Sequence, residues 1–133
     1  MREFHLQIVT PDGLVFDGNA EGILVRTESG DVEIMSGHTD YFATLGIGRA
    51  KLTVGGSSRN ASSSGGFISV KDGEVRLVAV TFEFSDEIDI ERAKAAKENA
   101  EDALKSEKDE KAMTLLKAKL ARAINRINVA ELK

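Results

Sequence analysis

Three arginines in the second half of the chain form the pattern best suited to binding chemistry. Arg122 and Arg126 stand four residues apart, so they lie on one face of a helix. Arg92 belongs to an earlier segment, and an antiparallel fold-back would bring it to the same end as the other two. Because a guanidinium presents a planar fork of donors to phosphate oxygens, the three side chains could hold one polyanion. The spacing equally permits these arginines to pair with acidic residues of the earlier segment.

Two carboxylates accompany these arginines in the sequence. Glu83 and Asp89 precede Arg92 and could accept hydrogen bonds from a sugar hydroxyl or an adenine amine. The sequence offers little for catalysis, because it has no cysteine, no phosphate-binding glycine loop and only two, widely separated histidines. It therefore predicts a binding protein without a metal site rather than an enzyme. The second histidine, His38, is either a packed loop residue or a contact to a partner subunit.

Composition excludes several other classes of protein. The 133 residues include 18 Lys and Arg against 22 Asp and Glu, giving a net charge of -4. This acidic balance argues against a nucleic-acid-binding protein, which normally carries a basic excess. No apolar run approaches the roughly 18 residues that span a membrane, and the N-terminus does not read as a signal peptide. The chain is accordingly predicted to be cytosolic, with no direct insertion into a membrane.

The chain changes character after Phe84. All 12 glycines, the single proline, both histidines and all the aromatic residues precede this point. Residues 85–133 instead combine ten alanines with 11 basic and 11 acidic residues. This contrast predicts an α+β chain of two units, a β unit at residues 1–84 and a helical unit at residues 85–133.

Alternation of apolar and polar residues predicts short strands in the first unit. They are expected at residues 3–9, 14–16, 22–27, 32–35, 48–54, 67–71, 75–80 and 81–84. Asp17–Asn19 is expected to turn, and Asp72-Gly73 suits a type I′ hairpin turn. Residues 55–66 indicate a flexible Gly- and Ser-rich loop, although Gly65-Gly66 could instead mark a bulge or close backbone packing. Together these elements favour an antiparallel sandwich or a flattened barrel.

The second unit reads as two amphipathic helices. Four alanines repeat at helical spacing in its first half, at positions 93, 96, 100 and 103. Residues 105–109 break this stripe and are the predicted connection of an antiparallel hairpin. Residues 85–110 hold five bases and ten acids, whereas residues 111–133 hold six bases and one acid. The two helices should therefore attract each other, and the basic one could also be drawn to an acidic partner.

Several motifs, in their order along the chain, resemble the epsilon subunit of bacterial F-type ATP synthases, which is called delta in mitochondria. They are Thr10–Gly13 with Val15–Gly18, Gly37-His38, Gly65–Val70 and Ile88–Ala93, followed by the two-helix plan. The resemblance covers essentially the full length. It implies a β-sandwich of about ten strands followed by a helical hairpin, in a non-catalytic rotor subunit that helps couple proton flow to ATP synthesis.

The resemblance also implies partners and a location. The sandwich would sit on the gamma subunit and the c-ring, at the cytoplasmic face of the bacterial membrane, as part of a peripheral subunit. The loop expected at this contact contains Asp31, Glu33 and His38, and it departs from the family pattern at Glu33 and Ser36. The extended helices would reach the catalytic beta subunits and inhibit ATP hydrolysis. The basic residues that suit an acidic segment there are Lys111, Lys117, Lys119, Arg122 and Arg126.

Some members of this family bind ATP on the folded hairpin through the motif [IL]-D-x-x-R-A. By resemblance, the phosphates would be held by Arg92, Arg122 and Arg126, and the nucleoside would be surrounded by Glu83, Ile88, Asp89 and Ala93. Asn99 stands where some ATP-binding members carry a basic residue, which implies weaker affinity. ATP would be a regulatory ligand that stabilises the folded hairpin, not a required cofactor. The alternative interpretation is a free-standing ATP-sensing module.

Overall fold

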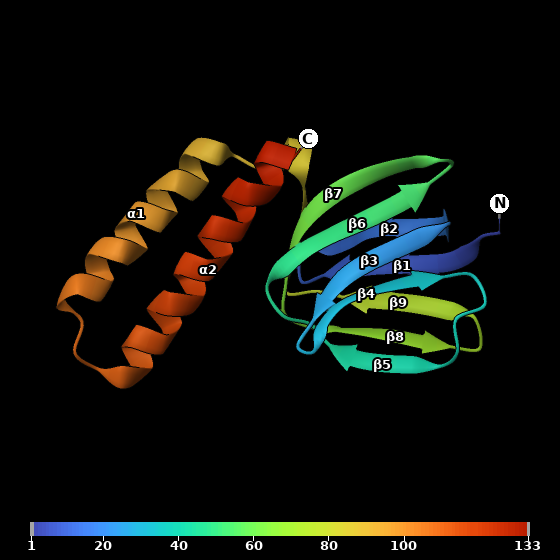
Figure 1. Cartoon of the computed structure of the whole chain (residues 1–133), viewed down its shortest axis with the longest axis horizontal. Coiled ribbons are helices and arrows are strands. Elements are labelled where there is room, and N and C mark those ends of the chain that lie inside the picture. Colours follow the sequence, from blue (N-terminus) through green and yellow to red (C-terminus); the bar gives the residue numbers. More distant parts are fainter. Residues whose placement is uncertain (1, 133) are drawn as a thin grey trace.

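The computed structural model describes residues 2–132 and consists of a β-sandwich followed by two helices (Figure 1). The described part of the sandwich contains ten strands. They are β1 (Phe4–Thr10), β2 (Gly13–Ala20), β3 (Gly22–Thr27), β4 (Gly30–Met35), β5 (Tyr41–Thr44), β6 (Gly48–Val54), β7 (Ser57–Ser64), β8 (Phe67–Lys71), β9 (Glu74–Val78) and β10 (Thr81–Phe84). The helices are α1 (Ile90–Ser106) and α2 (Glu110–Leu132), preceded by a 3₁₀ turn η1 (Ser85–Glu87).

The strands form two five-stranded sheets. The first sheet has the order β2-β1-β9-β8-β5, and the second has the order β10-β7-β6-β3-β4. The predicted sandwich is thus confirmed. One ladder departs from the antiparallel expectation, because β1 and β9 run parallel, with His5 opposite Glu74 and Val9 opposite Val78. These two strands are far apart in the sequence and are not joined by a hairpin, so the antiparallel arrangement is not imposed on them.

The core lies between the sheets and consists of residues that alternate along the strands. Its fully buried side chains include Leu6, Ile8, Ile23, Ile68 and Leu77. In β1 the alternation is regular: Phe4, Leu6 and Ile8 point inward while the intervening residues stay partly exposed. Burying such side chains stabilises the fold by about 1.5–3 kcal/mol each. The period-two pattern that predicted the strands is the same pattern that builds this core.

Three strand predictions were wrong, and pairing explains each error. β2 runs through Asp17–Asn19 without a turn, because β1 pairs with it along its whole length. The Ser-rich residues 57–64 form a strand instead of a flexible loop, since β7 is hydrogen-bonded to β6 on one side and β10 on the other. The strand Tyr41–Thr44 was missed, and it forms by pairing with β8 at the edge of its sheet.

Two turn predictions are confirmed by backbone angles. Asp72 and Gly73 both have positive φ, of 51° and 80°, as a type I′ turn requires between β8 and β9. Gly66 has φ of +88°, and a Cβ atom at this position would lie 1.8 Å from the carbonyl oxygen of Val78. Gly65-Gly66 therefore marks close backbone packing where the chain enters β8.

The helical hairpin begins and turns at two capping aspartates. Asp89 Oδ1 accepts a hydrogen bond from Arg92 N at 3.1 Å, and Asp109 Oδ2 accepts one from Ala112 N at 2.9 Å. The connection between the helices is residues 107–109, inside the predicted segment 105–109. Figure 1 shows α2 lying between α1 and the sandwich, so the second helix alone makes the extended contact with the strands.

The predicted alanine stripe is only partly buried. Ala93 and Ala100 of α1 and Ala123 of α2 are buried, but Ala96 is exposed. The two helices nevertheless pack against each other along their length. Within residues 2–132, neither helix is long and apolar enough to cross a bilayer.

Candidate anion site between the hairpin and the sandwich

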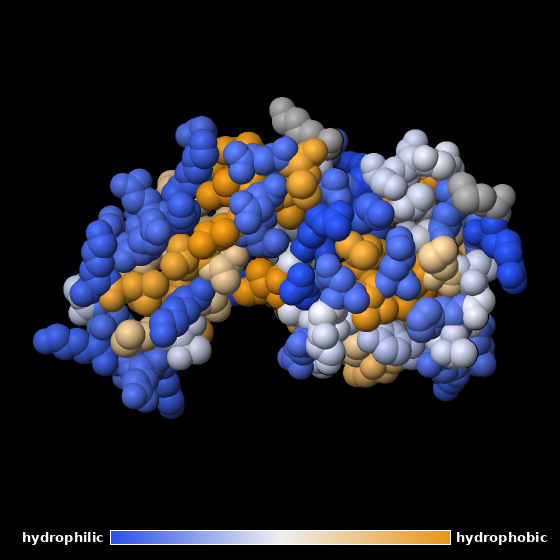
Figure 2. Space-filling model, viewed as in Figure 1, coloured by the Kyte–Doolittle hydropathy of each residue, from blue (hydrophilic) through white to orange (hydrophobic). Residues whose placement is uncertain are grey.

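A cavity of about 840 Å³, open to solvent on one side, lies between the hairpin and the sandwich. Figure 2 shows the surface hollowed where the two units meet. A cavity of this size falls in the range of small-molecule sites, which span about 300–1,000 Å³. It is lined by Thr10, Asp12, Ile47, Ser62, Ser64, Val80, Thr81, Phe82, Glu83, Arg92, Ala96, Asn99, Ala100, Leu116, Lys119, Arg122, Ala123 and Arg126. The lining therefore comes from both helices and from the strands below them.

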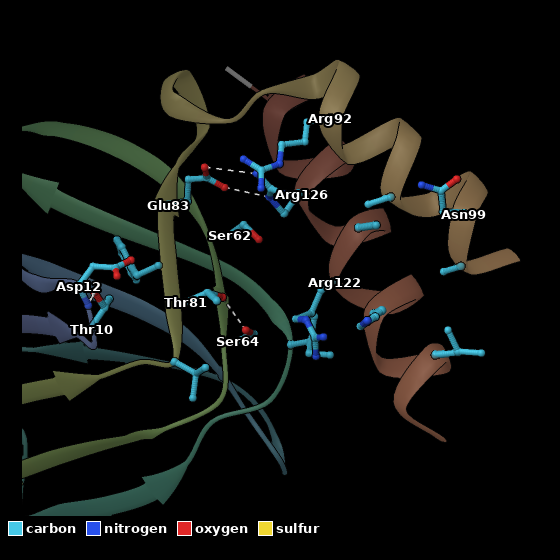
Figure 3. Close-up of a pocket in the computed structure, with 18 residues that line it drawn as sticks. Thr10, Asp12, Ser62, Ser64, Thr81, Glu83, Arg92, Asn99, Arg122 and Arg126 are labelled. Atoms are coloured by element: carbon cyan, nitrogen blue, oxygen red, sulfur yellow. Dashed lines mark hydrogen bonds and ion pairs between the residues drawn. The ribbon is translucent and has the colours of Figure 1, made fainter. Parts of the chain in front are cut away.

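Cationic side chains dominate the helical wall of this cavity. Arg92 extends from α1, and Arg122 and Arg126 extend from α2 (Figure 3). Lys119 of α2 is a fourth cation in the lining. The predicted convergence of three arginines from the two helices is thus what the structure shows. These four cations outnumber the two carboxylates that line the cavity, Glu83 and Asp12, so the excess positive charge would concentrate a polyanion.

One of these cations already has a partner. Arg126 Nε donates to Glu83 Oε1 at 2.9 Å and Arg126 Nη2 donates to Glu83 Oε2 at 3.3 Å, which makes a bidentate ion pair between α2 and β10. Arg92, Lys119 and Arg122 have no carboxylate of residues 2–132 within the 4.0 Å limit for a salt bridge. The alternative in which the arginines pair with acidic residues of α1 is therefore not what this structure contains.

The sandwich supplies a polar floor. Ser62 and Ser64 project from β7 and Thr81 from β10, with Ser64 Oγ and Thr81 Oγ1 hydrogen-bonded at 2.5 Å. Thr10 and Asp12, at the β1–β2 turn, complete the far wall (Figure 3). These hydroxyls and the Asp12 carboxylate can accept hydrogen bonds from a ligand's hydroxyl or amine groups.

The other residues expected near a nucleoside do not line this cavity. Ile88 borders a second hollow of about 680 Å³, formed with Ser58, Arg59, Asn60, Ser85, Asp86, Ile90 and Ala130. Asp89 caps α1 and Ala93 is fully buried. The structure thus brings Glu83 together with Arg92, Arg122 and Arg126, and it places Ile88, Asp89 and Ala93 around the start of α1.

The residues expected to contact partners divide between two surfaces. Asp31 is exposed and pairs with Arg26 at 2.6 Å, while Glu33 is exposed on β4. His38 lies half-buried in the loop after β4, where its Nδ1 is 2.7 Å from the Thr39 carbonyl oxygen and its ring meets the Tyr41 ring edge-on. His38 therefore makes both of these contacts within residues 38–41, while part of its surface stays accessible.

The lysines expected to contact an acidic partner all lie on α2. Lys111, Lys117 and Lys119 are exposed, and Lys119 also lines the cavity. One helix therefore carries both the cavity's cations and the lysines that remain available to solvent.

Sequence reasoning missed the residue that ties α2 to the sandwich. Asn125 Nδ2 donates to the Gly48 carbonyl oxygen at 3.0 Å and to Ser62 Oγ at 2.9 Å. Its position directly before Arg126 and three residues after Arg122 was the available signal, since it places the amide close to the face that carries both arginines.

A titratable cluster lies outside the cavity, on the outer face of the first sheet. His5 Nδ1 is 2.6 Å from Glu74 Oε2, and His5 Nε2 is 2.6 Å from Asp17 Oδ1. Two hydrogen bonds raise the pKa of His5 above its ordinary value, and the bond to Glu74 has a larger effect than the bond to Asp17. The hydrogen bond from His5, followed by that from Gln7, lowers the pKa of Asp17.

Comparisons with known proteins agree over the whole chain. Residues 3–85 match the family model of the ATP synthase delta/epsilon chain β-sandwich domain, and residues 86–131 match that of its long α-helix domain. The ATP synthase epsilon chain of Bacillus velezensis is 42% identical over 130 residues, covering 98% of each chain. The epsilon chain of Ruminococcus albus is 39% identical over 134 residues, covering 100% of each.

Solved structures show the same architecture. A chain of the Euglena gracilis mitochondrial ATP synthase, in a structure of OSCP, F1 and the c-ring, superposes with a TM-score of 0.83 at 25% identity. The match covers 98% of this chain and 82% of that one. A chain of the Tetrahymena thermophila mitochondrial enzyme shares the fold, with a TM-score of 0.65 at 13% identity and 97% coverage of both. The protein therefore belongs to the ATP synthase delta/epsilon chain family, as its similarity to bacterial epsilon chains over both units shows.

Proposed function

We propose that the chain is a non-catalytic rotor subunit of a proton-translocating F-type ATP synthase whose folded hairpin binds ATP as a regulatory ligand. The sandwich seats on the gamma subunit and the c-ring, and the hairpin inhibits ATP hydrolysis when it leaves the sandwich. The observation that carries the ATP proposal is the cavity between the two units, where four cations from two helices face a polar floor.

An apolar row on the sandwich supports the proposed seat. It crosses the outer face of the first sheet through register partners, from Leu14 through Val9 and Val78 to Phe67, which stacks on Phe42 at 5.3 Å. Leu14 and Phe42 are 61% and 64% exposed. A contiguous exposed apolar row on an otherwise polar sheet face is typical of a protein interface. The row is on the opposite sheet from the one that α2 contacts, so it is free for a partner while the hairpin is folded.

The phosphates of ATP fit the helical wall of the cavity. The guanidinium groups of Arg92 and Arg122 donate to no side chain among residues 2–132, and Lys119 adds a third cation. Arg126 is held by Glu83, so a phosphate would either share that arginine or displace the carboxylate. Because ATP would bind the folded hairpin and not the released one, it would stabilise the folded state by mass action.

The charge of α2 supports an inhibitory role for the released hairpin. Lys111 and Lys117 are exposed even in the folded state. The three cations that line the cavity would become exposed to solvent when the hairpin leaves the sandwich; they are Lys119, Arg122 and Arg126. A helix with five such cations complements an acidic surface, as the catalytic beta subunits are proposed to present. A free-standing ATP sensor would not need a basic helix that binds an acidic partner, so this feature distinguishes the two functions.

Two measurements on the full-length chain test the proposal. Calorimetric titration with ATP, with and without Mg²⁺, should show binding that Arg92→Ala and Arg122→Ala each weaken about tenfold or more, since each removes a charge-assisted phosphate contact. Lys111→Ala, an exposed lysine outside the cavity, is the matched control and should bind like the parent. Size-exclusion of the chain with the gamma subunit should give a stoichiometric complex. ATP binding without gamma binding would support the free-standing sensor, and binding of neither would overturn both.

A further inference from the structure

The folded hairpin is attached to the sandwich through a short run of α2. That helix packs on β7, β6 and the turn η1, whereas α1 stands outside it. Among residues 2–132, two side chains of α2 make the polar contacts that cross this boundary, and they are neighbours in the sequence. Arg126 pairs with Glu83 of β10, and Asn125 bonds to β6 and β7.

Asn125 is bonded through a single nitrogen to two acceptors on adjacent strands. Its Nδ2 atom carries two hydrogens, and one goes to the Gly48 carbonyl oxygen at 3.0 Å and the other to Ser62 Oγ at 2.9 Å. Both bonds are partly buried, and Ser62 is only 5% exposed. Because both donors of this nitrogen are used, rotating or shifting α2 leaves at least one buried acceptor without a partner.

The position of Asn125 fixes which face of α2 looks into the cavity. Arg122 precedes it by three residues and Arg126 follows directly, so the amide stands close to the face that carries the two cations. Holding the amide against Gly48 and Ser62 therefore sets both the distance of α2 from the sandwich and its rotation about its own axis.

We propose that Asn125 is a positioning residue, a neutral latch that docks the hairpin on the sandwich without any ligand and thereby aligns Arg122 and Arg126 in the cavity. The docking part of this proposal is argued from the two hydrogen bonds alone. The alignment of the arginines for a phosphate ligand rests on the proposed function. The latch differs from the neighbouring ion pair in its response to salt. Screening weakens Arg126–Glu83, whereas bonds from a neutral amide persist.

Spin-label distances on the ligand-free, full-length chain test the docking. The chain has no cysteine, so Glu28→Cys and Ala121→Cys, both exposed, give one label on the sandwich and one on α2. The parent should show one narrow distance distribution. Asn125→Ala should lower the ratio of docked to released molecules about fivefold or more, given the usual worth of a hydrogen bond. Asn128→Ala makes the same change at an exposed position of the same helix and should leave the distribution unchanged.

Three further variants separate the hydrogen bonds of Asn125 from its packing and from the neighbouring ion pair. Asn125→Asp keeps the size of the side chain but replaces its donors with a carboxylate, so it should release the hairpin at least as much as Asn125→Ala. Ser62→Ala removes one acceptor from the sandwich side and should act in the same direction with a smaller effect. With 0.5 M NaCl the effect of Asn125→Ala should remain, whereas that of Glu83→Gln should shrink.

Parent-like distances in both Asn125→Ala and Asn125→Asp would overturn the proposal. ATP titration of the same variants then tests alignment: the dissociation constant should rise in inverse proportion to the docked fraction that the distances give, because only the docked form binds. An unchanged dissociation constant in an undocked variant would overturn the alignment. If the parent itself does not bind ATP, the proposed ATP site fails while the distances still decide the latch.

Discussion

The ion pair between Glu83 and Arg126 gives a quantitative test of how the hairpin is held. It is bidentate, with contacts of 2.9 and 3.3 Å, and the two side chains are 33% and 27% exposed. Exposed pairs contribute about 0.2–1 kcal/mol, and a bidentate guanidinium–carboxylate pair is stronger. We therefore expect a coupling energy of about 1–2 kcal/mol, which changes the ratio of docked to released hairpin by about 5- to 30-fold.

A double-mutant cycle with Glu83→Gln and Arg126→Gln measures this coupling directly. The spin-label distances between the sandwich and α2 in the ligand-free chain give the ratio of docked to released hairpin, and hence the free energy of opening, in each variant. The coupling should fall at 0.5 M NaCl, because part of it is electrostatic attraction between partly exposed groups.

The matched control is the ion pair between Asp102 and Lys105 on α1. It is longer, at 3.5 Å, and its side chains are 64% and 78% exposed. Its coupling should be below about 0.5 kcal/mol, and its variants should leave the distance between the sandwich and α2 unchanged. If the Glu83–Arg126 cycle gives no more coupling than this control, the pair does not hold the hairpin and the reasoning is refuted.

Three further perturbations test other parts of the structure. Gly66→Ala should cost several kcal/mol or prevent folding in thermal melts, because its Cβ would meet the Val78 carbonyl oxygen at 1.8 Å, whereas Gly55→Ala, with nothing within 4 Å, should cost about 1 kcal/mol. Protonated His5 stabilises the sheet through Glu74 and Asp17, and because its pKa is raised, this stability should be complete below pH 6.5 and lost as pH rises through the folded-state pKa. In urea titrations His5→Gln should flatten that decline, and a parent-like decline would contradict the assignment. Asp89→Ala should destabilise the start of α1 by about 1 kcal/mol and lower the helicity seen by circular dichroism, whereas Asp89→Ser should retain the cap. Equal helicity in the parent and both variants would show that Asp89 does not act as a cap.

The hairpin was predictable because the interactions that define it join residues close in the sequence. Alanine spacing, charge segregation and the polar segment at 105–109 all act between residues close in the sequence, and the structure places the connection at 107–109. The sandwich was predictable only where apolar alternation is strong, as in β1. The Ser-rich β7 has no such signal and becomes a strand because β6 and β10 flank it.

The candidate site also has a part that the sequence predicts and a part that it does not. Spacing alone placed Arg122 and Arg126 on one face, and the hairpin brought Arg92 to them. The polar floor from Ser62, Ser64 and Thr81 could not be anticipated, because it depends on which strands lie next to α2 in the fold.

The most direct test of the account is steady-state ATP hydrolysis by an ATP synthase F1 complex depleted of its epsilon chain, measured with and without this full-length protein. Stoichiometric addition should lower the rate, and rising ATP should relieve part of that inhibition by favouring the docked hairpin. Arg122→Ala should inhibit but respond less to ATP, because it removes a cation of the cavity. A rate that is the same with and without the protein at every ATP concentration would contradict the account.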